Sequence, residues 1–334
     1  MESASQLKKR LKNVGLSDAA INAAWPEWWS DTASDSVSAQ TELRFSIARK
    51  LGLDPHSLLE DNQEPRFIWR DEARFKHLSD EGRLELSAIT SFGSALGKLL
   101  AAAISVPAPL PYLNALELRE AILREQKYVR LVDLLSVCWS IGLPVVHLRV
   151  FPTLRKRMAA MSVRIDGRYV ILMGKDSMYP PHVAFYLAHE LGHVALGHLV
   201  KDSAIVDLEA KELSAQGDDP DEVSADRFAL ELLTGLTEPR VLSKSKSYNA
   251  RQLAHAVLSA SIELRIEPGT LALCFGYSTG QWMKTNAAIK RVYASPIPVW
   301  SEINKVAADH LDLSRIPDDA RSYVRAALGE AVAA

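Results

Sequence analysis

The chain has 334 residues, enough for two or three domains that each bury a core, because single cores usually stop growing below this length. Its 39 Lys and Arg residues nearly balance 41 Asp and Glu residues, so no whole-molecule field attracts nucleic acid or an anionic membrane. The two cysteines, Cys138 and Cys274, lie far apart in apolar runs, which favours buried thiols over a disulfide framework.

Residues 1–62 are expected to form a small helical domain, with helices that end at Gly15 and Gly52 and with Ser17 as an N-cap. Its last part, residues 48–61 (ARKLGLDPHSLLED), is similar to the closing helices of Cro/repressor-type helix-turn-helix domains. However, seven Lys or Arg residues against nine Asp or Glu make a poor surface for phosphate binding. Binding of nucleic acid is therefore only weakly supported, and we favour packing or partner binding.

The middle of the chain is expected to alternate between helices and strands. Residues 63–112 are interpreted as a connector with one helix. Residues 114–143 have apolar positions at helical spacing, which predicts one long amphipathic helix. Residues 144–151 predict a strand, and residues 161–176 predict a hairpin that turns at Asp166-Gly167.

Two further helices are expected after the hairpin. One begins at Pro180-Pro181 and ends at Gly197, a punctuation typical of helix ends. A polar loop then leads to a second helix over residues 221–235, and the remainder is again mostly helical. The amino terminus carries no apolar signal region, and prolines interrupt the apolar run 96–111 before it could cross a bilayer. We expect a cytoplasmic protein without a membrane partner.

The stretch YLAHELGHVALGHLV, residues 186–200, contains an H-E-x-x-H pattern. On a helix, His189 and His193 lie on one face and aim at one point, while Glu190 can reach a water beside it. Two such histidines are typical zinc ligands and the glutamate a general base. Because burial of these groups without a partner would be costly, we predict one Zn²⁺ ion.

The third ligand is expected on the next helix, where Glu222 and Asp226 are four residues apart and face the same way. We predict that Glu222 completes the ligand set. Asp226 would accept the remaining ring N–H of a ligand histidine and fix its orientation. Asp221 is adjacent and stays an alternative ligand, although it faces away from the side that the other two share.

A further histidine, His198, does not fit a ligand register. The metzincin pattern has a glycine three residues and a histidine six residues after the second histidine, and here those positions hold Leu196 and Leu199. We therefore interpret His198 as a helix-end or supporting residue, a bystander to the metal rather than a ligand.

Residues 184–198 (AFYLAHELGHVALGH) and 221–233 (DEVSADRFALELL) together resemble the ImmA/IrrE metallopeptidases, a likeness that spans about residues 113–236. The resemblance implies a compact zincin core in a cytoplasmic peptidase of bacterial or phage origin. It also implies that the substrate is a helix-turn-helix repressor, cleaved in stress response or mobile-element control. By position it carries over His189, His193 and Glu222 as zinc ligands and Glu190 as the catalytic residue.

The expected fold is therefore α+β and mainly α: a zincin-like core with a small sheet, flanked by helical segments at both ends. We expect four parts: a helix-turn-helix-like domain, a connector, a zincin peptidase domain and a helical C-terminal domain. These cover residues 1–62, 63–112, 113–240 and 241–334.

The expected reaction is zinc-dependent peptide hydrolysis, with Glu190 taking a proton from water and passing it to the leaving amine. A substrate peptide could add alongside the strand 168–174. Candidates for stabilising the oxyanion are Tyr179, His182, His255 and Tyr277, each of which is more simply explained as structural.

Two other classes of function stay open. In the first, the zinc is structural and the protein is a non-proteolytic transcriptional regulator. In the second, it is a partner protein of a toxin-antitoxin or phage-defence operon, with any proteolysis confined to one cognate protein. Glu190 favours catalysis, because a merely structural zinc has no use for a general base.

Overall fold

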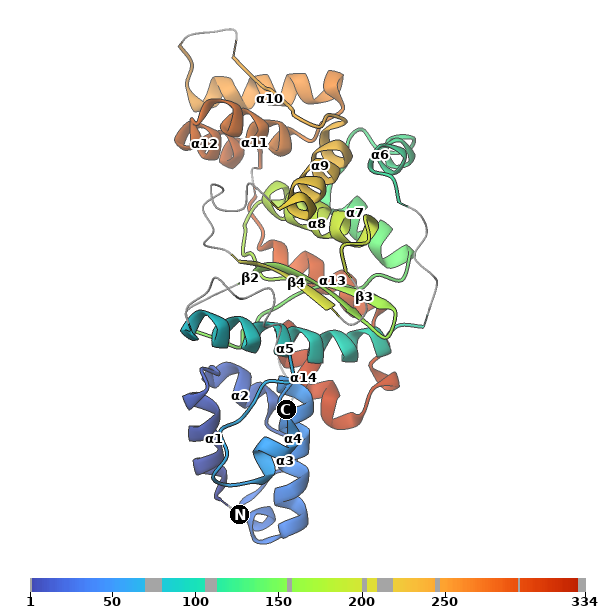
Figure 1. Ribbon diagram of the computed structural model, residues 1–334. Coiled ribbons are helices and arrows are strands. Elements are labelled where there is room, and N and C mark those ends of the chain that lie inside the picture. Colours follow the sequence, from blue (N-terminus) through green and yellow to red (C-terminus); the bar gives the residue numbers. More distant parts are fainter. Residues whose placement is uncertain are drawn as a thin grey trace.

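The computed structural model describes residues 2–69, 80–105, 113–154, 158–199, 203–208, 219–243, 247–293 and 295–329. These residues form a mainly helical structure around one small mixed β-sheet, which agrees with the α+β class expected from the sequence. Figure 1 shows the layers, from the N-terminal helices through α5 (Asp80–Ala102), the sheet and α8 (Pro180–Ala195) to the group α10–α12 (residues 250–292). Of the helices in the described ranges, none is both long and apolar enough to cross a lipid bilayer.

The N-terminal segment folds into a group of short helices, as its punctuation predicts. The Ser17 side chain accepts from the backbone N–H of Ala20, and α3 ends at Gly52, whose φ of 69° is the left-handed conformation that glycine adopts easily. The elements are α1 (Ala4–Asn13), α2 (Asp18–Ala24), η1 (Asp31–Asp35), α3 (Val37–Leu51) and α4 (Pro55–Leu59).

Four strands form the sheet in the order β1-β3-β2-β4, with β1 parallel to β3 and the other pairs antiparallel. The β2–β3 hairpin turns at Asp166-Gly167 as predicted, because both residues have positive φ, 51° and 76°. The strands are β1 (Val145–His147), β2 (Met158–Ile165), β3 (Arg168–Met173) and β4 (Ser203–Leu208).

Strand β3 lies inside the sheet, between β1 and β2. Strand β2 pairs with all of β3, and β1 pairs with Ile171–Met173, so a peptide cannot add alongside these three residues without displacing a strand. The expectation that a substrate adds alongside residues 168–174 is therefore not supported over this part of the strand.

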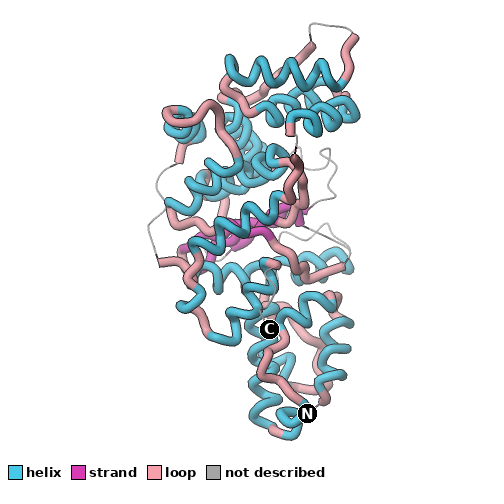
Figure 2. Tube along the Cα trace, turned by 180° about the vertical axis from the view of Figure 1, so that it is seen from behind, coloured by secondary structure: helices cyan, strands magenta, loops and turns pink. Residues whose placement is uncertain are grey.

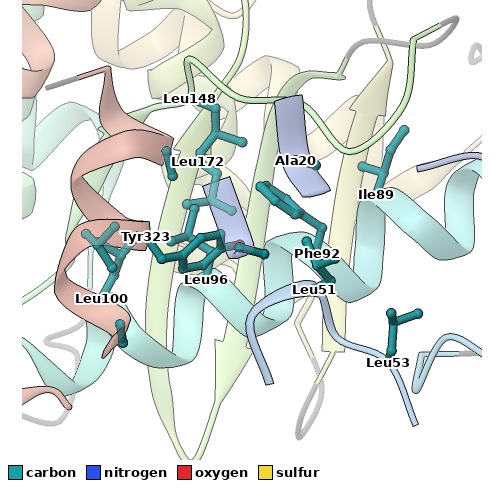
Figure 3. Close-up of a cluster of buried hydrophobic side chains, with 14 of the residues drawn as sticks. Ala20, Leu51, Leu53, Ile89, Phe92, Leu96, Leu100, Leu148, Leu172 and Tyr323 are labelled. Carbon is teal, nitrogen blue, oxygen red and sulfur yellow. The ribbon is translucent and has the colours of Figure 1, made fainter. Parts of the chain in front are cut away.

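Both faces of the sheet are buried, because successive side chains of β2 point to opposite sides. Met161 and Val163 join one hydrophobic cluster, while Ala160 joins the other. Helix α5 (Asp80–Ala102) covers the first face, and it approaches closely at Gly93, where an added Cβ would lie 2.4 Å from the sulfur of Met161. Figure 3 shows Phe92 and Leu96 of this helix among the buried side chains of this face.

Helices α7, α8 and α13 contribute to the cluster on the other face, and Figure 2 shows from behind how the strands are covered on both sides. The single helix expected over residues 114–143 is wrong: the chain breaks after Leu123 and resumes at Leu131. The new helix starts where Asp133 accepts from the backbone N–H of Arg130. The elements are α6 (Ala115–Leu123), α7 (Leu131–Ser140), α8 (Pro180–Ala195), α9 (Pro220–Thr234) and α13 (Val299–His310).

The last part of the chain divides between two places. Helices α10 (Ala250–Leu264), α11 (Pro268–Thr279) and α12 (Trp282–Val292) form a hydrophobic cluster of their own. In contrast, α14 (Asp318–Leu328) returns to pack against α2, α3 and α5. Segments expected to be a connector and a C-terminal domain thus supply helices to shared cores, and the four-domain division stays a prediction.

Candidate metal centre

Helix α8 carries the H-E-x-x-H residues, and its ends match its sequence. Pro180 and Pro181 occupy its first positions, where a missing N–H is harmless. In its middle, Gly192 lets helix α9 approach, because a Cβ there would lie only 3.1–3.2 Å from the backbone of Ala225 and the Cβ of Phe228. The sequence therefore brings the two expected ligand-bearing helices close together.

The side chains of His189, His193 and Glu222 converge on one point. The two Nε2 atoms of the histidines lie 3.0 Å apart. A Glu222 carboxylate oxygen lies 3.3 Å from Nε2 of His189, and the other lies 3.7 Å from Nε2 of His193. Three potential ligand atoms thus lie within 4.8 Å of one another.

This donor set has the chemistry and spacing that zinc requires. Zinc is held at about 2.0–2.2 Å by imidazole nitrogen and carboxylate oxygen, which in a tetrahedral site separates the donors by roughly 3.3 Å. The observed separations of 3.0, 3.3 and 3.7 Å bracket that value. Both histidines are buried, whereas the Glu222 side chain is 19% exposed, so the cluster opens toward solvent on the α9 side.

Asp226 lies one turn after Glu222, with a carboxylate oxygen 2.8 Å from Nδ1 of His189. Burial by itself lowers the pKa of His189, but the bonds to Asp226 and Glu222 outweigh it and raise this pKa to about 10. For Glu222, burial by itself raises the pKa. The bonds of its carboxylate to His189 and His193 outweigh burial and hold the pKa of Glu222 well below its ordinary value. The cluster thus holds Glu222 as a charged carboxylate beside two imidazole nitrogens, a donor set that suits a divalent cation.

Glu190 is completely buried beside this cluster. The Ser162 hydroxyl on β2 donates to its Oε2, and within the described ranges its Oε1 has no hydrogen-bond partner. Burial raises the pKa of Glu190 to about 7, while the charges of His189 and His193 oppose that rise. A carboxylate with one unsatisfied oxygen and a pKa near neutrality is suited to proton transfer.

The remaining sequence candidates lie outside the donor cluster. Asp221 faces His198, with its carboxylate 3.8 Å from that ring, so it is directed away from the point that Glu222 faces. His255 is exposed on α10, and the ring of Tyr179 packs on Tyr293.

The two other candidates for stabilising the oxyanion are Tyr277 and His182. Burial and then the neighbouring Asp226 carboxylate raise the pKa of Tyr277, whose ring packs edge-on against Trp282. His182 lies on the first turn of α8, where burial lowers its pKa. The oxyanion-stabilising group stays unassigned.

Two contacts of the site are not readable from its motifs. Ser162 reaches Glu190 from a strand 28 residues earlier, and Ser has no distinctive signal there. His198 lies with its Nδ1 2.9 Å from Nδ1 of His193, so it contacts one of the predicted ligands directly. The contact of His198 did have a signal in the sequence, because Gly197 predicts that the chain turns back at the end of α8.

Comparison of the chain with models of known families, with curated proteins and with solved structures gave no match. The resemblance to the ImmA/IrrE metallopeptidases thus stays a prediction that depends on the motif residues alone. The function must be argued from the chemistry of the site.

Proposed function

We propose that this chain is a zinc-dependent metallo-endopeptidase with a zincin-like core, in which His189, His193 and Glu222 hold the metal. The observation that carries the proposal is Glu190: a buried carboxylate with an unsatisfied oxygen, next to a donor set of zinc-like spacing. A zinc ion in that set supplies a Lewis acid that polarises a peptide carbonyl and acidifies water. A structural zinc site would not need a buried base.

The side chains of the chain itself then have separate tasks. Oε1 of Glu190 accepts the proton of the attacking water and afterwards delivers it to the nitrogen of the leaving amine. Ser162 holds Oε2 of the same carboxylate and so orients the oxygen that works. Asp226 accepts from Nδ1 of His189, which leaves Nε2 as the ligand atom.

The resemblance to ImmA/IrrE proteins suggests a substrate class, a helix-turn-helix repressor or another cognate regulator. The direct test incubates the zinc-loaded protein with the repressor-like product of the neighbouring gene and identifies fragments by intact mass. We expect Glu190→Gln to keep its zinc and to lose cleavage by at least about 100-fold, the scale of general-base catalysis. The exposed Glu263 on α10 offers a matched control, and Glu263→Gln should cleave normally.

Two results decide against the proposal. Equal cleavage by Glu190→Gln and wild type would remove Glu190 from the mechanism. A purified protein that holds no zinc, or that holds equal zinc after His193→Ala, would remove the metal site. Retained zinc together with a complete absence of cleavage across neighbouring regulators would favour the alternative, a non-proteolytic regulator or defence-operon partner with a structural zinc.

A further inference from the structure

His198, three residues past the end of α8, folds back onto His193, one of the two proposed histidine ligands. Gly197 adopts a left-handed conformation with φ of 75°, and the backbone N–H of His198 then donates to the carbonyl of His193 at 3.1 Å. This is the bond pattern of a glycine-terminated helix end. It brings the two rings together, with centroids 5.0 Å apart and planes at 72°.

A chain of polar contacts runs from His193 through the His198 ring to helix α9. Nδ1 of His193 lies 2.9 Å from Nδ1 of His198. Nε2 of His198 lies 3.2 Å from the Ser224 hydroxyl, which donates to the backbone carbonyl of Asp221 at 3.1 Å. The His198 side chain is only 10% exposed, so water competes little for these bonds.

The proton positions along this chain have one consistent order. When Nε2 of His193 binds the proposed metal, its lone pair is used there, so the ring proton lies on Nδ1. Nδ1 of His198 therefore accepts, its Nε2 carries the proton and donates to Ser224, and Ser224 donates to a carbonyl. Every donor meets an acceptor, and the chain ends on the backbone.

We propose that His198 is a positioning residue that fixes the tautomer and the ring orientation of His193 for the metal, with Ser224 as its anchor. This inference rests on the proposed zinc site. It gives the two histidine ligands different supports: a carboxylate, Asp226, for His189 and a neutral imidazole for His193. Helix α9 then supplies a ligand and both anchors, so the metal site depends on one α8–α9 geometry.

The test measures zinc affinity of the purified full chain by competition with a chromophoric chelator. His198→Ala should bind zinc about 10–100-fold more weakly, as is usual when a ligand histidine loses its orienting partner. His198→Asn places an amide oxygen near the position of Nδ1 and should recover most of that loss. Ser224→Ala should weaken binding less than His198→Ala, and the exposed His56 serves as a matched control, with His56→Ala unchanged.

A second readout separates positioning from folding. Cobalt loaded into the site reports ligand geometry through its visible absorption, which should change in His198→Ala and return toward wild type in His198→Asn. If His198→Ala does not fold, the affinity and spectrum of Ser224→Ala decide. Wild-type affinity in His198→Ala, or in Ser224→Ala where only that variant folds, would overturn the inference and leave the zinc site standing. Equal losses in His198→Ala and His198→Asn would overturn it too, and a wild type that binds no zinc would overturn the proposed function with it.

Discussion

At the residue scale, the pKa of Glu190 is set by its burial, by the charges of the neighbouring histidines and by one hydroxyl. Burial disfavours the charged form, the charges of His189 and His193 oppose that effect, and the bond from Ser162 adds a smaller contribution in the same direction. Residues two apart on a strand point to the same face, so Ser162 lies on the α8 side of the sheet together with Ala160 of β2. The basicity of the proposed catalytic group thus depends on a strand residue far from the motif.

We predict that Ser162→Ala shifts the acid limb of the cleavage rate to higher pH, by about 1 unit. Loss of a donor to the carboxylate destabilises its charged form, so the pKa of Glu190 rises and a higher pH is needed to deprotonate the base. The measurement is kcat/KM against pH. Ser140→Ala, at an exposed serine on α7, is the control, and an acid limb that stays in place in Ser162→Ala would contradict the prediction.

The sequence predicted which residues converge, but not how they are supported. Helical periodicity places His189 with His193 on one face and Glu222 with Asp226 on another, because residues four apart share a face. The H-E-x-x-H motif, which requires a third ligand, then predicts that the two pairs meet. His198 reaches His193 because Gly197 adopts a left-handed conformation. The spacing expected of metal ligands excludes His198 as a ligand, but it says nothing about this contact.

At the element scale, the site depends on how closely α8 and α9 approach. Gly192 faces the backbone of Ala225 at a separation that leaves no room for a methyl group without movement. Glu222, the proposed third ligand, lies on the same helix as Ala225. The distance between these helices therefore controls whether Glu222 reaches the two histidines.

We predict that Gly192→Ala lowers the free energy of unfolding by about 1–3 kcal/mol, because it overpacks a backbone contact, and weakens zinc binding. Gly97→Ala on α5 is the matched control, since its Cβ would meet Val163 at an ordinary 3.6 Å. That variant should be neutral or stabilised by up to about 1 kcal/mol through helix propensity. Denaturant unfolding measures the free energy of unfolding, and chelator competition measures the zinc affinity. Equal behaviour of the two variants in these measurements would contradict the prediction.

The two errors at this scale have a common physical cause. The break between α6 and α7 has no glycine or proline to announce it. It is held by distant contacts, because the Arg265 guanidinium donates to the carbonyls of Leu123 and Gln126. Strand β4 lies in the stretch expected to be a polar loop, and its pairing with β2 joins residues 39 to 50 positions apart. Tertiary contacts decide both cases, and local patterns do not contain them.

At the scale of the whole molecule, the N-terminal helices share a hydrophobic core with the rest of the protein and do not form a separate domain core. Residues of α1–α4, α5, α14 and the sheet share one hydrophobic cluster. The basic side chains of this segment also serve internal contacts: Arg10, Arg44 and Lys50 donate to backbone carbonyls. Their use inside the fold lowers the charge left for phosphate groups, which does not favour DNA binding.

We predict that Tyr323→Ala destabilises the N-terminal helices as well as α14, by about 3–5 kcal/mol. The Tyr323 ring is completely buried against Phe92, and its hydroxyl donates to the Lys50 carbonyl at 2.7 Å. Hydrogen exchange should rise together in α3 and α5. Tyr323→Phe, which loses only the hydroxyl bond, should cost about 1 kcal/mol.

A tyrosine in another cluster provides the control for this experiment. Tyr248 packs against Phe275 within the α10–α12 group. Tyr248→Ala should therefore speed exchange in those helices and leave α3 protected. Wild-type protection of α3 in Tyr323→Ala would show that the N-terminal helices fold independently of the C-terminal one.

The contact between Tyr323 and Lys50 joins residues 273 positions apart in the chain. During synthesis, at about 5–20 residues per second, the ribosome needs roughly 14–55 s to travel from one to the other. Throughout that interval the apolar surface of the first helices lacks its final cover. The nascent N-terminal segment therefore leaves apolar surface uncovered for that time, and its native packing is completed only once Tyr323 has been synthesised.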